Sequence, residues 1–265
     1  MNIDGTLVLV ESDGIEKEVT SLNMQSFNST IESIYDYEYF ESLVNIITVN
    51  TNELEGYLEE NKLHKDLYES RHGQNLQMEI QRLYLNLASS QRAFVDTLRK
   101  TISARGREEH LEIFEKSLSA QYDNNLGYQL IDGLRNFAQH QTLLPVTIRQ
   151  SGSELRFKVE RNVILNSDGI SPSLRKALEV NTDIDLHDLL PRWRESYSEL
   201  HEIIRYLFID MALEACDKLI SISSLSSDES VVMRLKFQVN SEIYELPIPL
   251  ETAKKIINLR SQTSL

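Results

Sequence analysis

Residues 75–103, NLQMEIQRLYLNLASSQRAFVDTLRKTIS, carry the clearest periodic pattern of the chain. Large apolar residues recur in this stretch at steps of three, four or seven, at Leu76, Ile80, Leu83, Leu87, Phe94 and Leu98. On an α-helix these positions share one face, so the stretch predicts a long helix with one buried side. Only 9 glycines and 5 prolines among 265 residues also favour long helices over many turns.

Shorter helices and strand pairs are expected around this helix. A capping box at Ser29 and Glu32 predicts a helix that reaches about residue 49. Further helices are expected over 51–70, 108–119, 126–140, 173–180 and 187–222, and from Pro249 onward. Alternating apolar residues predict strand pairs over 6–19, 146–161 and 231–248. The six serines of 221–230 predict a flexible connection.

The expected fold class is therefore mainly α, a helical bundle decorated with short β-hairpins. Residues 1–27 are interpreted as an N-terminal hairpin extension, 28–145 as the helical core, and 146–265 as hairpins and a long helix packed on that core. A two-stranded ribbon is marginal alone. We therefore expect the hairpins 146–161 and 231–248 to join in one small sheet, with 6–19 as a further member.

Charge is distributed unevenly along the chain. The net charge is −14, of which residues 1–60 contribute −12 and the remaining residues −2. Residues 91–107 hold five bases and one acid and form a local basic stripe. This stripe is either a solvated helix face or a surface beside a catalytic groove that binds phosphates. No apolar run approaches the ~20 residues of a membrane span, and no signal peptide is recognised, so a cytoplasmic protein without a membrane partner is expected. The single cysteine, Cys216, is expected to be a buried thiol.

Side chains that can act in catalysis are concentrated in one hexapeptide, Arg135-Asn136-Phe137-Ala138-Gln139-His140. It lies at the end of the predicted helix 126–140. Arginine can hold a phosphate with two donors, and histidine can move a proton near neutral pH. No HExxH spacing, Walker loop or dinucleotide fingerprint occurs, so neither a metal nor a cofactor is expected.

An Arg-Asn-x-x-x-His motif near the end of a helix in a helical bundle resembles the HEPN superfamily. Arg135, Asn136 and His140 match the family's motif residue by residue. The resemblance implies a homodimer whose two motifs meet in a cleft and cut RNA without metal. It also implies a toxin, with an antitoxin protein as a possible partner, or a nuclease of phage defence or stress.

Within that interpretation each motif residue receives a role. His140 is expected to be the general acid–base, and Arg135 to stabilise charge on the phosphorus. Asn136 and His140 lie four residues apart and share a helix face, so Asn136 is expected to orient the imidazole. Arg92, Arg99 and Lys100 of the basic stripe are expected to bind the substrate.

Two alternatives stay open. Arg135 and His140 could simply meet solvent or carbonyl groups at a helix end, where basic residues are favoured electrostatically. The protein would then be a catalytically silent interaction module that pairs through the helix 187–222. The near-heptad stripe of that helix, Tyr197, Leu200, Ile204, Leu207 and Met211, is either core or a dimer seam.

Overall fold

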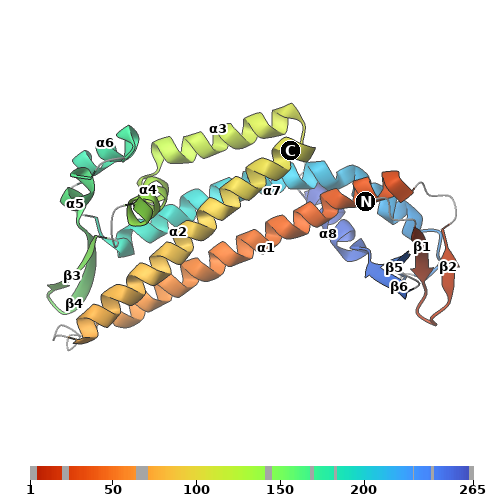
Figure 1. Ribbon diagram of the computed structural model, residues 1–265, viewed down its shortest axis with the longest axis horizontal. Helices are drawn as coiled ribbons and strands as arrows, with labels where there is room; N and C mark the ends of the chain where they lie inside the picture. The colour runs from red at the N-terminus through yellow and green to blue at the C-terminus, as the bar shows by residue number, and fades with distance from the viewer. Residues whose placement is uncertain are drawn as a thin grey trace. The chain divides into compact units, whose positions relative to one another are not determined.

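A computed structural model of the protein describes residues 5–19, 24–63, 71–140, 145–167, 170–181, 184–228, 230–239 and 242–262. The chain is 72% helical, with eight helices and two small antiparallel sheets in these residues (Figure 1). The expected fold class, mainly α with short β-hairpins, is confirmed.

The chain divides into two compact units. The terminal unit comprises residues 1–41 and 205–265, and the central unit comprises residues 42–204. The division falls within α1 (Met24–Asn61) and within α7 (Leu186–Ser223), so both helices contribute residues to both units. The organisation into 1–27, 28–145 and 146–265 stays a prediction from the sequence.

The central unit is built on α2 (Arg71–Arg105). All six apolar residues of the periodic stretch are buried, which confirms the predicted long helix. Two helices predicted from the sequence, α3 (Glu108–Asn124) and α4 (Leu126–His140), pack against α2. The buried Tyr84 hydroxyl of α2 donates a hydrogen bond to the Leu130 carbonyl oxygen of α4 at 2.9 Å, which fixes the contact between the two helices.

A hairpin and two short helices complete the central unit. Strands β3 (Val146–Ser151) and β4 (Glu154–Val159) pair antiparallel, as predicted. Gly152 in their turn has a φ of 61°, in the left-handed region that favours glycine. Helix α5 (Arg161–Leu165) was not predicted, whereas α6 (Pro172–Val180) was, and the Ser171 hydroxyl caps α6 by accepting the Leu174 N–H at 3.2 Å.

The terminal unit contains the second sheet, of strands β1 (Gly5–Val10), β2 (Glu16–Glu18), β5 (Val232–Val239) and β6 (Glu242–Pro247), and helix α8 (Leu250–Gln262). The strand order is β2-β1-β5-β6, and each neighbouring pair is antiparallel. The expectation that 146–161 joins this sheet is wrong, because β3 and β4 form a separate sheet in the described part of the chain. The expectation that 6–19 and 231–248 pair is confirmed, since β1 matches β5 over all six of its residues.

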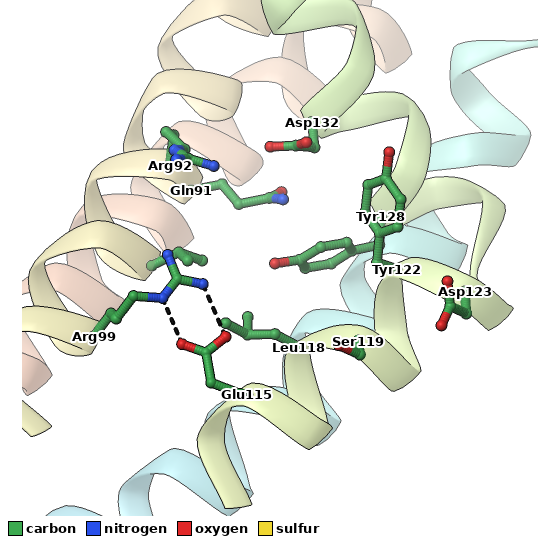
Figure 2. A pocket seen from close by; sticks show the side chains of 11 residues that line it. Gln91, Arg92, Arg99, Glu115, Leu118, Ser119, Tyr122, Asp123, Tyr128 and Asp132 are labelled. Atoms are coloured by element: carbon green, nitrogen blue, oxygen red, sulfur yellow. Dashed lines mark hydrogen bonds and ion pairs between the residues drawn. The ribbon is translucent and has the colours of Figure 1, made fainter. Parts of the chain in front are cut away.

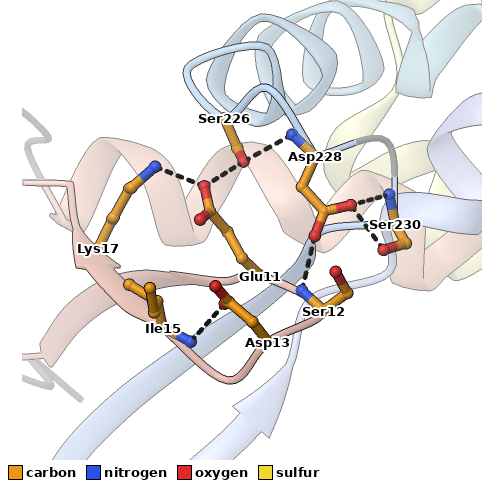
Figure 3. Close-up of polar contacts among 8 residues, drawn as sticks. All are labelled: Glu11, Ser12, Asp13, Ile15, Lys17, Ser226, Asp228 and Ser230. Atoms are coloured by element: carbon orange, nitrogen blue, oxygen red, sulfur yellow. Dashed lines mark hydrogen bonds and ion pairs between the residues drawn. The ribbon is translucent and has the colours of Figure 1, made fainter.

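The serine-rich segment before β5 is bonded to the turn between β1 and β2 (Figure 3). The Asp228 carboxylate accepts hydrogen bonds from the backbone N–H of Ser12 at 2.6 Å and of Ser230 at 2.9 Å. Those donors, together with the Ser230 hydroxyl, hold the pKa of Asp228 well below its usual value. The Ser226 hydroxyl donates to Glu11 at 2.6 Å. The described residues of this predicted flexible connection therefore make specific contacts.

Helix α1 differs from its prediction. The sequence predicts a start at Ser29 and two helices over 29–70, whereas one helix begins at Met24 and continues to Asn61. Residues 64–70 and the side chain of Ser29 lie outside the described part. The helix continues across residues 49–51 because Ile47, Thr51 and Leu54 are all buried, and the Thr51 hydroxyl donates to the Ile47 carbonyl oxygen at 2.7 Å.

Helix α7 carries the near-heptad stripe in the interior of the chain. Of the five stripe residues, Tyr197, Leu200, Ile204 and Leu207 are buried and Met211 is half-buried. Cys216 is also buried. The stripe is therefore core, and it is not an exposed seam for a second copy. The expectation for Cys216 is confirmed, and burial raises the pKa of its thiol to about 12.

Candidate functional site

The motif Arg135, Asn136 and His140 occupies the C-terminal half of α4. Leu130, Ile131, Leu134 and Phe137 of this helix are buried, so the motif is carried by a helix that is anchored in the core. Arg135 is half-buried, while the side chains of Asn136 and His140 lie outside the described part of the structure. The roles assigned to Asn136 and His140 therefore stay predictions.

Close backbone contacts fix the position of α4. At its start, Asn125 accepts the Tyr128 N–H at 3.1 Å and donates to the Arg192 carbonyl oxygen of α7, also at 3.1 Å. A Cβ added at Gly127 would lie 2.5 Å from the backbone nitrogen of Trp193 in α7. Two residues before the motif, a Cβ at Gly133 would lie 2.2 Å from the Leu174 side chain of α6. Glycine thus lets α4 approach both neighbouring helices.

A cavity of about 280 Å³ lies between α2, α3 and α4 (Figure 2). It is open to solvent, and α4 contributes Tyr128 and Asp132, which precede Asn136 by two turns and one turn. The residues that line it are Gln91, Arg92, Val95, Arg99, Glu115, Leu118, Ser119, Tyr122, Asp123, Tyr128 and Asp132. The cavity therefore continues the face of α4 on which Asn136 lies.

Two of the three predicted substrate-binding residues line this cavity. Arg92 donates from Nε to the Asp96 carboxylate at 2.8 Å. Arg99 forms a two-donor ion pair with Glu115 of α3, at 2.5 and 3.1 Å. Lys100 is exposed and is not among the lining residues. Both cavity arginines therefore already face a carboxylate of the protein itself.

Asp132 connects the motif to the cavity. Burial raises the pKa of this carboxyl, and the positive charges of Arg92 and Arg135 act in the opposite direction without cancelling that effect. The charges of the motif arginine and of one predicted substrate-binding arginine thus both act on one carboxyl group, although 43 residues separate the two arginines in the sequence.

Gln91 and Tyr128 are buried residues that line the cavity. The indole N–H of Trp193 donates to the Gln91 side-chain oxygen at 2.6 Å. Burial raises the pKa of Tyr128 well above its ordinary value, so its hydroxyl is neutral. The hydrogen bond from Trp193 fixes the Gln91 side chain.

Sequence reasoning did not identify Gln91, Tyr128 or Asp132 as site residues. A spacing of four residues places Tyr128, Asp132 and Asn136 on one helix face. This spacing could have indicated that Asp132 and Asn136 belong to one site. Gln91 offered no such signal, because its role depends on Trp193 of a distant helix. Three other polar residues of α2, Asn86, Ser90 and Asp96, do not line this cavity.

Function has to be inferred from the residues themselves, because comparison with protein-family models, with curated proteins and with solved structures finds no match. In the part of the chain that the structure describes, no helix is both long and apolar enough to cross a membrane. No group of three or more His, Cys, Asp or Glu side chains among the described residues could hold a metal ion.

Proposed function

We propose that the protein is a metal-independent endoribonuclease of the HEPN type, acting as a toxin or in phage defence or stress. The observation that carries this proposal is the Arg-Asn-x-x-x-His motif at the end of a core-anchored helix, beside an open cavity. The positive charge of Arg135 acts on the pKa of the cavity residue Asp132. The same arginine can hold an RNA phosphate with two N–H donors, and a neutral imidazole nearby can remove the 2′-hydroxyl proton.

The proposed reaction uses the RNA's own 2′-hydroxyl as nucleophile. His140 removes its proton, the 2′-oxygen attacks the phosphorus, and the bond from phosphorus to the 5′-oxygen breaks. Arg135 stabilises the negative charge that develops on the phosphoryl oxygens. A protonated imidazole gives its proton to the leaving 5′-oxygen. The products are a 2′,3′-cyclic phosphate end and a 5′-hydroxyl end, and no metal takes part.

One motif contains one imidazole, whereas the reaction uses a base and an acid at the same time. Arg135 and His140 also point about 140° apart on an ideal helix, so a single helix end does not present both to one phosphate easily. A second copy related by a two-fold axis supplies the missing groups.

We therefore expect a homodimer in solution, with α2 and α4 flanking the interface. Light scattering at micromolar concentration should report twice the mass of the chain. A monomer under the conditions in which RNA is cut would contradict the two-copy mechanism.

The alternative, a catalytically silent interaction protein, requires the α7 stripe to be exposed for pairing. That stripe is instead buried within the chain. We also propose an antitoxin protein as a partner that binds the nuclease and keeps it inactive.

The experiment that tests the proposal is cleavage of a panel of structured and single-stranded RNAs by the purified protein in excess EDTA. We expect cleavage to continue at an unchanged rate, with 2′,3′-cyclic phosphate ends detected by mass spectrometry. Cleavage that stops in EDTA and returns with added Mg²⁺ or Mn²⁺ would contradict the metal-independent mechanism. If no RNA of the panel is cut, the proposal that the protein is a nuclease is contradicted.

A further inference from the structure

The cavity beside the motif is unsuited to a phosphate. Its lining holds three carboxylates, Glu115, Asp123 and Asp132, against two arginines that already face Glu115 and Asp96. An anion inside it would be repelled by the carboxylates that remain. Its volume of about 280 Å³ lies at the lower end of the range for ligand sites and suits one small planar group.

Asp132 supplies unused hydrogen-bond acceptors in this cavity. Its carboxylate is half-buried, and no residue that the structure describes donates a hydrogen bond to it. Figure 2 shows Asp132 and Arg92 on facing helices at the same end of the cavity. Since Asp132 accepts no hydrogen bond from the described residues, a ligand that brings N–H groups to this partly desolvated carboxylate gains binding energy there.

We propose that the cavity binds the guanine base of a nucleotide close to the scissile phosphate, an inference that rests on the proposed ribonuclease function. The Watson–Crick edge of guanine presents two neighbouring N–H donors beside a carbonyl oxygen. The two oxygens of Asp132 accept those donors, and the Arg92 guanidinium donates to the carbonyl oxygen. No other RNA base presents two adjacent donors next to an acceptor on this edge.

The cavity wall and its distance from the motif fit this assignment. Tyr122 and Tyr128 give the cavity two aromatic side chains, and bases of single-stranded RNA commonly stack on such rings. Asp132 precedes His140 by eight residues, which is about 12 Å along the helix axis. A base bound at Asp132 therefore belongs to a nucleotide near the phosphate held by the motif.

The test measures binding of 3′-GMP to the full-length protein by calorimetry, alongside 3′-AMP, 3′-CMP and 3′-UMP. Wild type should bind 3′-GMP at least about tenfold more tightly than the other three nucleotides. Asp132→Asn, which replaces an acceptor by a donor with little change of shape, should weaken 3′-GMP binding by about tenfold. The exposed Asp217 of α7 provides a matched control, and Asp217→Asn should bind as wild type does.

Equal affinity for all four nucleotides, a preference for another base, or unchanged binding by a folded Asp132→Asn protein would overturn the guanine assignment. The base preference of wild type needs no variant, so the test stands even if Asp132→Asn does not fold.

Cleavage assays separate this inference from the proposed function. RNA cut without any guanine preference would refute the guanine assignment and leave the ribonuclease intact. Conversely, the protein could bind 3′-GMP through Asp132 and yet cut no RNA. That result would refute the proposed ribonuclease function and support the guanine site.

Discussion

Replacing His140 by alanine is expected to lower RNA cleavage by at least ~10²-fold, because the reaction loses both the group that accepts the 2′-hydroxyl proton and the group that protonates the leaving oxygen. Arg135→Ala is expected to lower cleavage by a comparable factor, since a positioned donor to the developing charge is lost. Arg135→Lys should recover part of this loss, because a point charge cannot reproduce the planar donor fork. Asn136→Ala should be mildest, as Asn136 orients the imidazole and does not react.

These variants need a measure of folding beside the kinetic assay. His140 is the last residue of α4, so His140→Ala should melt within a few degrees of wild type. A folded His140→Ala protein that cuts RNA as fast as wild type would remove His140 from the mechanism. A His140→Ala protein that unfolds outright would instead assign the residue to the core.

Gly127→Ala is expected to destabilise the protein by about 2–3 kcal/mol, the upper end of the cost of overpacking a close contact. The added Cβ would lie 2.5 Å from the Trp193 nitrogen and 2.9 Å from its Cα. These are backbone atoms of α7, so no side chain can rotate away and one helix must shift. Thermal unfolding followed by circular dichroism should show a melting temperature lower by several degrees.

Gly56→Ala provides the control for this prediction. Gly56 lies within α1, and a Cβ there meets no atom within 4 Å. Alanine is the better helix former by roughly 1 kcal/mol, so Gly56→Ala should leave the melting temperature unchanged or raise it. If Gly127→Ala were as stable as Gly56→Ala, the close packing of α4 on α7 would be wrong.

Local sequence patterns predicted most elements, because the patterns reflect which face of each element is buried. The stripe from Leu76 to Leu98 identified α2, and the alternation of apolar residues identified the three hairpins. Helix α1 was divided in two because β-branched and amide residues gather near Thr51, where tertiary burial overrides a weak local preference. Helix α5 was missed because its five residues are too few for a helical period to show.

Pairings between distant segments could not be predicted in the same way. Nothing local distinguishes β1 from β3 as the partner of β5, because the choice depends on how the chain returns through α7. In the candidate site, the helix that carries Arg135 was predicted, and Arg92 and Arg99 line the cavity. That these two arginines bind the substrate stays a prediction. The ion pair between Arg99 and Glu115 was not foreseen, since it requires α2 and α3 to pack side by side.

The decisive measurement is the cleavage rate of one RNA substrate by wild type and by His140→Ala, side by side in excess EDTA. Wild type is expected to cut the RNA and to leave 2′,3′-cyclic phosphate ends, while the folded variant is slower by at least ~10²-fold. Equal rates for the two proteins, or an RNA that wild type leaves intact, would contradict the metal-independent ribonuclease mechanism.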